Sequence, residues 1–337
     1  MKILVLQLKR IGDLLLTTPT LFALRKNLPD AHITLVVDHG CRELLPAIDF
    51  VDETLVFDRA GKNGPLLRKL IFRGFDVCLD FTGTDRSTFF AMLSKAAKRV
   101  AFEWVQRSRW RPIFYTDFIA SSVRENHTVD HYLHMLGALD IEARDMPVTL
   151  HLPEWAHKKA QQLLSEVKVS GPFVLVHPGT ARPEKYWLPE RWAQVIDFVE
   201  RELQLPCVIT GSGDGAEEEH ISKIKAALSA PARDLSGRLD LLTLAALTQN
   251  AQLVLTVDSA PMHLAGAFGT PQVALFGKTN PFHWRPRHAR AIVILGDKML
   301  ADADFKPHHE QALMSETSTA RVTDAILAVH AKGKQRA

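Results

Sequence analysis

Four stretches of this 337-residue chain combine polar residues in patterns that could do chemistry, and the clearest is TVDSAPMHLAGAFGTPQVALFG, residues 256–277. It places Asp258, Ser259 and His263 between two short apolar runs rich in β-branched residues, a pattern typical of strands buried in a parallel sheet. Open α/β sheets bind ligands where a strand passes into a helix. We therefore predict a strand-helix-strand unit whose polar residues form a ligand site. The simpler alternative is that Asp258 only caps the helix.

A second stretch, HPGTARPEKYWLPERW at residues 177–192, also follows a predicted strand. Thr180 supplies a hydroxyl, and Arg182 and Lys185 supply two cations in one loop. Such a loop at the carboxyl end of a strand suits a phosphate or pyrophosphate, with Lys185 acting as a compact charge. The alternative is that both cations only face water.

A third stretch, TGSGDGAEEEH at residues 210–220, is rich in glycine. Its G-x-G-x-G spacing differs from the G-x-G-x-x-G that dinucleotide-binding oxidoreductases carry after their first strand, so it is weak evidence for a nicotinamide cofactor. No cofactor is predicted. Glu217 or Glu218, at the start of the following helix, could accept hydrogen bonds from ribose hydroxyls, although the helix dipole alone also favours acids there.

The fourth stretch, KRIGDLLLTTP at residues 9–19, follows the first apolar run of the chain. Lys9 and Arg10 precede Gly12, which permits close approach of a ligand to the backbone. This loop could hold an anionic group, or it could present the carboxylate of Asp13 to a reactant. The alternative role for Asp13 is to cap the helix that begins here.

No metal site is predicted. His127, His131 and His134 recur at near-helical spacing, but no acid or cysteine obviously converges on them. Asp302 and Asp304 form a D-x-D pattern that can hold a metal-bound nucleotide, but they lie in a poorly patterned segment, which favours solvent exposure.

Strand-like and helical runs alternate along the chain, which predicts an α/β fold with parallel sheets. Strands are expected at residues 3–6, 33–37, 55–57, 77–81, 173–176, 207–210, 253–257 and 272–276. Helices are expected at residues 14–28, 42–48, 66–72, 87–97, 190–203, 217–228, 242–248 and 319–331. The rhythm breaks around residues 143–155, where two prolines flank a short extended piece. We therefore predict two Rossmann-like domains, residues 1–150 and 151–320, with a cleft between them, and a C-terminal helix and basic tail over residues 321–337.

Composition limits the partners only weakly, because a net charge of +3 argues neither for nor against nucleic acid. A cluster of cations with interleaved aromatic residues could meet an anionic saccharide, a phosphate-rich membrane surface or RNA, or it could be an ordinary solvated face. The cluster consists of Lys95, Lys98, Arg99, Phe102, Trp104, Arg107, Arg109, Trp110 and Arg111. No apolar stretch of about 18 residues occurs, so any membrane contact is expected to be peripheral. Three widely spaced cysteines without a C-x-x-C pair fit a reducing compartment.

In this order, GDLLLTTP, HPGTARPEKYWLPERW and VDSAPMHLAGAFGTPQVALFGKTNPFHWRP resemble the motifs of the bacterial lipopolysaccharide heptosyltransferases, glycosyltransferase family 9. The resemblance covers the chain up to about residue 290. It implies a GT-B fold, in which the active site lies between two Rossmann-like domains. It also implies transfer of heptose from ADP-heptose to the lipopolysaccharide inner core, with inversion and without a metal. The details around FTGTDRS and HTVDHYLHMLGALDI look most like the third heptosyltransferase of the core.

The resemblance further implies roles for individual residues. Asp13 becomes the general base, in a first domain that binds the acceptor. The second domain binds the donor: Thr180 and Lys185 its diphosphate, Glu217 or Glu218 its ribose, and Asp258 and His263 its sugar and phosphate. Lys185, Arg182 and the helix amino terminus near Ser259 would stabilise the leaving ADP. The family often has glycine after Ser259, where this chain has Ala260, so a methyl group is expected beside the donor.

The implied partners are ADP-heptose, a lipopolysaccharide core acceptor and the inner face of the cytoplasmic membrane. The protein is thus expected to be cytoplasmic and peripherally bound to that membrane, without a nucleic acid partner. Three other interpretations stay open: a GT-B transferase or epimerase that uses another nucleotide sugar, a nucleotide-sugar-binding module that has lost catalysis and, more distantly, a nicotinamide dehydrogenase. The presence of Asp13 argues against the binding module.

Overall fold

A computed structural model of the protein describes residues 1–308 and 311–334. The chain divides into two compact units, Met1–His151 and Leu152–Ala337, whereas the sequence predicts the junction between residues 150 and 151. The predicted basic tail lies partly outside the described residues, because residues 335–337 do. The α/β class with parallel sheets is confirmed in both units.

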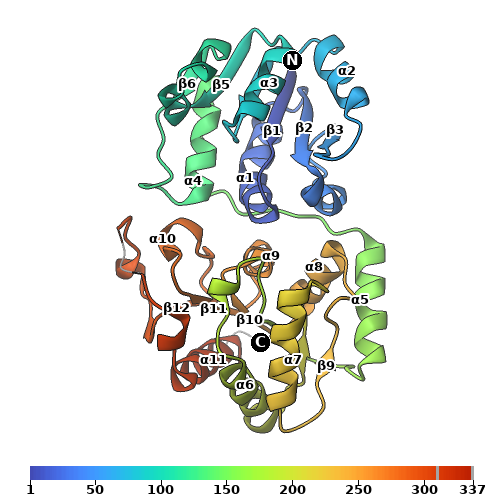
Figure 1. The fold of residues 1–337 in the computed structure, drawn as a ribbon, viewed down its shortest axis with the longest axis vertical. Coiled ribbons are helices and arrows are strands. Elements are labelled where there is room, and N and C mark those ends of the chain that lie inside the picture. The colour runs from blue at the N-terminus through green and yellow to red at the C-terminus, as the bar shows by residue number, and fades with distance from the viewer. Residues whose placement is uncertain (309–310, 335–337) are drawn as a thin grey trace. The chain divides into compact units, whose positions relative to one another are not determined.

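The first unit is built on a parallel sheet with the strand order β3-β2-β1-β4-β5-β6 (Figure 1). Its strands are β1 (Lys2–Gln7), β2 (His32–Asp38), β3 (Glu53–Phe57), β4 (Val77–Asp80), β5 (Lys98–Phe102) and β6 (Asp117–Ile119). Its α-helices are α1 (Ile11–Asn27), α2 (Gly64–Phe72), α3 (Asp85–Ser94) and α4 (Thr128–Leu133), and its 3-10 helices are η1 (His39–Ala47), η2 (Glu103–Arg107), η3 (Arg111–Phe114) and η4 (His134–Leu139). Residues 42–48, predicted as an α-helix, thus belong mostly to a 3-10 helix that contains Pro46.

The second unit has a sheet with the order β13-β12-β11-β10-β7-β8-β9, parallel except where β13 meets β12. Its strands are β7 (Val174–His177), β8 (Cys207–Ile209), β9 (Arg233–Asp234), β10 (Leu253–Val257), β11 (Gln272–Phe276), β12 (Ala291–Leu295) and β13 (Lys298–Met299). Its α-helices are α5 (Glu154–Glu166), α6 (Pro189–Glu202), α7 (Gly215–Ala227), α8 (Leu241–Asn250), α9 (Ala260–Phe268), α10 (Pro281–Trp284) and α11 (Thr319–Lys334). Its 3-10 helices are η5 (Pro183–Lys185), η6 (Asp302–Asp304) and η7 (Met314–Glu316).

Both sheets reverse their winding direction at one place. In the first unit the chain runs from β1 outward to β3 and then returns to add β4 on the other side of β1. In the second unit it runs from β7 to β9 and returns to add β10 beside β7. At such a switch point the loops after the two central strands diverge, and open α/β sheets bind their ligands there.

The core of the second unit includes helix α11 and two tryptophans that follow β7. The rings of Trp187 and Trp192 are fully buried and meet edge to face, with centroids 5.2 Å apart. The indole N–H of Trp187 donates to the carbonyl of Thr317, just before α11. The buried side chains of Val322 and Ile326 pack in the same cluster, so α11 is part of this unit's core and not an appendage to it.

Within the described ranges, no helix has both the length and the apolar character that crossing a membrane requires.

Candidate functional site

Two of the predicted phosphate-site residues form an ion pair at the switch point of the second unit. Lys185 ends η5 in the loop after β7, and Asp258 directly follows β10. The Nζ of Lys185 lies 2.5 Å from Oδ2 of Asp258, and the two side chains are only 14% and 8% exposed. Little water therefore screens this pair, and it ties together the two loops that diverge at the switch point.

The helix that follows Asp258 begins without a side-chain cap. Ser259 is the N-cap residue of α9, but its side chain does not bond to the backbone N–H groups of the first turn, and its hydroxyl instead lies 3.2 Å from that of Thr256. Because the N-cap is Ser259 and the Asp258 carboxylate binds Lys185, the capping alternative for Asp258 is wrong. Ala260 opens the helix, and His263 is buried within it.

Glu217 and Glu218, which the sequence leaves as alternatives, differ sharply in the structure. Glu218 is exposed, whereas Glu217 is buried, and its Oε2 accepts a hydrogen bond of 2.6 Å from Ser212. The other oxygen, Oε1, has no hydrogen-bond partner among the described residues and lies 3.6 Å from Nε2 of His177, at the end of β7. Burial lowers the pKa of His177, and the nearby Glu217 carboxylate opposes that shift. Glu217 therefore keeps an unused acceptor close to the end of β7.

Two glycines make room for this carboxylate. A Cβ on Gly179 would overlap the side chain of Glu217. A Cβ on Gly211 would overlap Ile221 and would lie 2.8 Å from Oε1 of Glu217. The first glycine of the G-x-G-x-G stretch thus serves the packing of Glu217.

The two other predicted donor-site residues of this loop are Thr180 and Arg182. Arg182 is exposed and forms no ion pair in the part of the chain that the structure describes, and Thr180 is half-buried. Arg182 therefore presents its charge to solvent.

In the first unit, Asp13 lies at the switch point but does not cap its helix. It is the third residue of α1, whose N-cap is Arg10, and no side chain caps this helix. Oδ1 of Asp13 instead accepts a hydrogen bond of 2.8 Å from the hydroxyl of Tyr132, on α4. The capping alternative for Asp13 is wrong, and its carboxylate is oriented by a residue from another helix.

Lys9 completes this cluster. Its Nζ lies 3.3 Å from the Tyr132 hydroxyl and 5.3 Å from the centre of the Tyr132 ring. Burial lowers the pKa of Lys9, while Asp13 and Asp80 act in the opposite direction. Burial and the Asp13 charge raise the pKa of Tyr132 well above its usual range, so its hydroxyl stays protonated and donates. Gly12, in the first turn of α1, is half-buried, and Arg10 is exposed.

The loop after β4 shapes the other side of this switch point. The Asp80 carboxylate, fully buried, accepts hydrogen bonds from the backbone N–H groups of Thr82 and Gly83, at 2.8 and 3.0 Å. Thr82 in turn accepts a bond from the N–H of Leu8. These contacts join the loop after β4 to the loop that carries Lys9.

Sequence reasoning missed Tyr132, which lies inside the histidine-rich stretch that could suggest a metal. The ring of His131 stacks on Phe102 at 3.8 Å, and both His131 and His134 bond through Nδ1 to the hydroxyl of Ser121. The sequence offers one signal for Tyr132, a tyrosine among polar residues at near-helical spacing. Once such a tyrosine is buried, its hydroxyl needs a hydrogen-bond partner.

No group of three or more histidine, cysteine, aspartate or glutamate side chains converges to hold a metal anywhere in residues 1–308 and 311–334. In the D-x-D pattern, Asp304 instead pairs with Lys298 at 2.5 Å.

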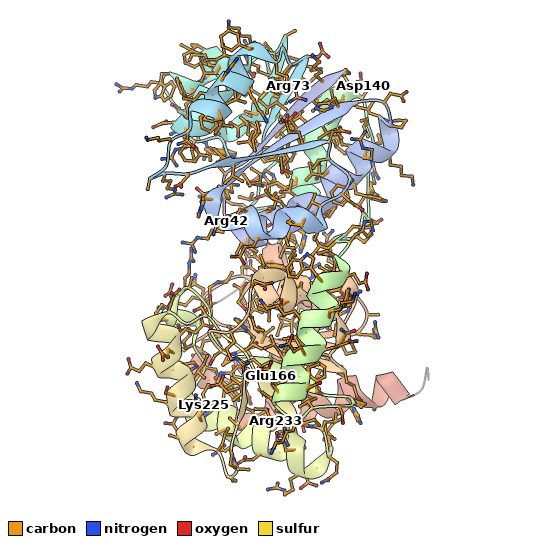
Figure 2. The ribbon with its side chains drawn as sticks, turned by 90° about the vertical axis from the view of Figure 1, so that its right-hand side faces the viewer. Arg42, Arg73, Asp140, Glu166, Lys225 and Arg233 are labelled. Atoms are coloured by element: carbon orange, nitrogen blue, oxygen red, sulfur yellow. The ribbon has the colours of Figure 1, made fainter. Side chains whose placement is uncertain are left out.

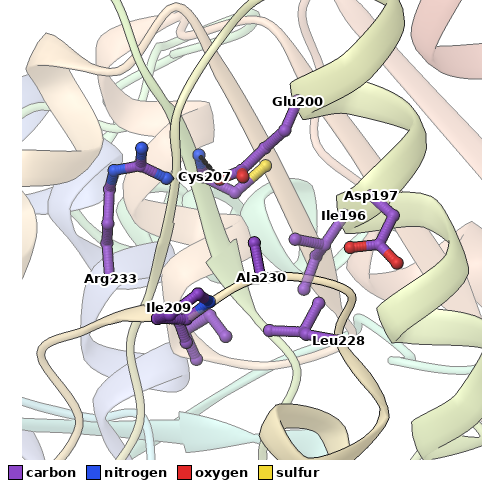
Figure 3. Close-up of a pocket in the computed structure, with 10 residues that line it drawn as sticks. Ile196, Asp197, Glu200, Cys207, Ile209, Leu228, Ala230 and Arg233 are labelled. Carbon is purple, nitrogen blue, oxygen red and sulfur yellow. Dashed lines mark hydrogen bonds and ion pairs between the residues drawn. The ribbon is translucent and has the colours of Figure 1, made fainter.

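A small pocket of the second unit lies away from these residues (Figure 3). It is lined by Ile209 of β8, by Asp197 and Glu200 of α6 and by Arg233 of β9, among others. Glu200 is already bonded to Arg233 and to the backbone N–H of Cys207. None of the predicted site residues lines it, so it is not the predicted donor site.

The chain matches one family model, that of glycosyltransferase family 9 (heptosyltransferase), over residues 64–313. Lipopolysaccharide heptosyltransferase 3 of Escherichia coli is 26% identical over 286 residues, which cover 82% of this chain and 83% of the relative. A solved family 9 glycosyltransferase from Veillonella parvula DSM 2008 has a TM-score of 0.86 at 25% identity, and covers 98% of this chain and 97% of its own. The E. coli ADP-heptose lipopolysaccharide heptosyltransferase II has a TM-score of 0.79 at 22% identity, with 99% and 100% covered.

The two Rossmann-like units have the GT-B fold of the solved E. coli heptosyltransferase, as the family resemblance implies. The family model spans most of the chain and includes both loops of the second unit's switch point. The chain belongs to glycosyltransferase family 9, the heptosyltransferases, and is a glycosyltransferase.

Proposed function

We propose that this enzyme transfers heptose from ADP-heptose to the lipopolysaccharide inner core and inverts the anomeric centre. The observation that carries the proposal is the family match over residues 64–313, supported by relatives named as lipopolysaccharide heptosyltransferases. The 26% identity with heptosyltransferase 3 of E. coli supports addition of the third heptose in particular.

The second unit is proposed to bind the donor. Lys185 has three donor hydrogens, so it can hold Asp258 and a phosphate oxygen at once. The uncapped amino terminus of α9, at Ser259 and Ala260, offers backbone N–H groups and a positive dipole end to the same diphosphate. Thr180, Arg182 and His263 complete the proposed phosphate and sugar contacts.

Glu217 is the better of the two candidates for the ribose contact. Its buried Oε1 lacks a hydrogen-bond partner within the described ranges, and a ribose hydroxyl is a donor of the kind that would satisfy it. Glu218 is exposed to water and has no such need.

The first unit is proposed to supply the base. The acceptor hydroxyl oxygen attacks the anomeric carbon, the bond from that carbon to the phosphate oxygen of ADP breaks, and the hydroxyl proton passes to the Asp13 carboxylate. ADP leaves with the bonding electrons, and Lys185 and the α9 terminus stabilise its charge. A single displacement of this kind inverts the anomeric carbon. Tyr132 keeps the carboxylate oriented throughout.

Transfer is proposed to need no metal, because the cations of this chain take over the leaving-group charge. Excess EDTA should leave turnover nearly unchanged. Loss of activity that magnesium or manganese restores would contradict this and would make Asp302 and Asp304 candidate ligands.

The acceptor is part of a lipid-anchored molecule, so we also propose that the enzyme works on the cytoplasmic side of the inner membrane as a peripheral protein. Mass spectrometry of the lipopolysaccharide core from cells that lack this gene tests the function. The core should lose a single heptose, and an unchanged core would contradict the proposal.

A further inference from the structure

Helices α2 and α3 of the first unit lie against each other, and α3 also contacts η3. Five of the eleven large hydrophobic side chains exposed in the described chain lie on these elements or directly before η3. They are Phe72, Phe89, Met92, Trp110 and Ile113. We call these side chains and the cations between them the α2–α3 face. Exposed apolar side chains that gather on neighbouring elements indicate a surface that binds a partner.

The spacing on α3 explains why these side chains point outward. Arg86, Phe89, Met92 and Lys95 recur every three residues and are all exposed, while Phe90 and other residues between them are buried against the sheet. The solvent side of α3 thus has an apolar middle and a cation at each end.

Four exposed cations on or beside these elements lack acidic partners, although Lys69 of α2 pairs with Glu53. Arg68, Lys95, Arg107 and Arg109 are exposed, and no ion pair involves them in the ranges that the structure describes. Helix α2 contains no acid, and Asp85, the acid of α3, is taken by Arg111 at 2.6 Å.

Some cations of the second unit are matched by acids, although Arg182 is not among the described residues. In the second unit, Lys225 pairs with Asp234 and Arg233 pairs with Glu200, at 2.5 and 2.6 Å (Figure 2 labels both cations). The α2–α3 face thus combines the unpaired charges of four cations with exposed apolar groups.

We propose that the α2–α3 face binds the anionic lipid surface of a bilayer. Large apolar side chains such as Phe72 and Ile113, exposed by 78% and 73%, gain by entering the boundary between headgroups and acyl chains. Trp110 is of the type that favours this boundary, and the unpaired cations are attracted to anionic headgroups. The proposal rests on the proposed function to the extent that a lipid-anchored acceptor requires the enzyme at a membrane, and it names the surface that binds.

Vesicle flotation of the full-length protein tests this. The protein should bind vesicles made of phosphatidylcholine and phosphatidylglycerol in equal parts, and should not bind phosphatidylcholine alone. Phe72→Glu and Ile113→Glu each replace an inserted apolar group by a charge that the lipid repels. Since one charge near such a surface changes the partition about five-fold, each variant should bind at least about five-fold more weakly.

Trp155→Glu is the matched control, because Trp155 is an exposed aromatic residue of the second unit, on α5. It should float like the unmodified protein. Equal flotation of all three variants, or no binding to the anionic vesicles, would overturn the proposal. Tighter binding to single-stranded RNA than to the vesicles, abolished by Phe72→Glu, would also overturn it in favour of a nucleic acid surface.

Calorimetric titration with ADP separates this test from the proposed function. Phe72→Glu and Ile113→Glu should bind ADP as the unmodified protein does, because neither residue belongs to the donor site. Flotation requires no turnover. If the enzyme does not transfer heptose, the flotation result therefore still shows whether this face binds the membrane.

Discussion

Asp258 places a buried negative charge in the loop where the donor diphosphate is proposed to bind. A bare carboxylate there would repel a phosphate, and Lys185 at 2.5 Å neutralises it. The ion pair therefore allows an anion to bind at this site. Removal of either charge should change both the affinity for the donor and the free energy of unfolding.

Lys185→Ala should weaken the binding of ADP-heptose by roughly 2 to 4 kcal/mol, because it removes a charge-assisted contact and leaves the carboxylate unpaired. Titration calorimetry measures this, and Lys223→Ala is the control, since Lys223 pairs with Glu219 on an exposed helix surface. Adding Asp258→Asn to Lys185→Ala should recover part of the affinity. Unchanged affinity in the single variant would remove Lys185 from the site.

Tyr132→Phe should lower kcat roughly ten-fold or more with little change in donor affinity, because the Asp13 carboxylate loses the bond that orients it. Steady-state kinetics measure the split between kcat and KM. Tyr115→Phe is the matched control, since the Tyr115 hydroxyl donates to another buried acid of the same unit, Asp80, at 2.5 Å. Equal loss of kcat in both variants would mean that Tyr132 acts only through stability.

At the scale of elements, the sequence predicts the strands that are apolar throughout, such as β10, because burial on both faces leaves a continuous apolar run. It does not predict β5, which begins with Lys98 and Arg99 inside the basic cluster. In the structure Lys98 and Arg99 donate hydrogen bonds to the backbone carbonyls of Ala138 and Phe114. Val100 and Phe102, farther along the strand, are buried. Such contacts depend on tertiary neighbours and leave no periodic trace in the sequence.

The turn after β7 depends on the absence of a side chain at Gly179. Gly179→Ala should push the Glu217 carboxylate out of its place, which costs about 1 to 3 kcal/mol of stability and weakens ADP binding. Thermal unfolding and calorimetry measure the two effects. Gly171→Ala is the control, because nothing lies within 4 Å of the added methyl group, and it should change neither. Destabilised Gly179→Ala with full ADP affinity would separate this loop from donor binding.

Across the whole molecule, the predicted chemistry gathers at the switch point of each unit's sheet, with Asp13 in one unit and the Lys185–Asp258 pair in the other. The sequence identifies these residues because they follow strands. It does not identify Tyr132, which is separated from Asp13 by 119 positions and meets it only when α1 packs against α4. Neither Asp13 nor Asp258 is an N-cap residue in the structure. The sequence alone leaves capping open for both, because it does not locate a helix end to the exact residue.

The burial of His131 in its neutral form should make the stability of the protein depend on pH in the acid range. Burial, then the charges of Lys9 and His134, lower the pKa of His131 from 6.5 to about 3. The unfolded chain therefore binds a proton between these values that the folded chain does not, so stability falls as pH drops through this window, by up to about 1.4 kcal/mol per pH unit. His131→Asn should show a smaller slope between about pH 6.5 and pH 5. Thermal unfolding across this range measures it, and an unchanged slope would show that His131 gains its proton in the folded state.

The proposed role of Asp13 as proton acceptor is tested by the rate of ADP release by the Asp13→Asn variant, with ADP-heptose and a lipopolysaccharide core acceptor. Asparagine keeps an oxygen that accepts from Tyr132, so folding and ADP-heptose affinity should stay close to those of the unmodified enzyme, whose donor residues lie in the other unit. The proton acceptor is lost, and a positioned base typically contributes about 10² to 10⁴ in rate. We therefore expect an active unmodified enzyme and a variant slower by that factor. A variant that releases ADP at the full rate would contradict this role.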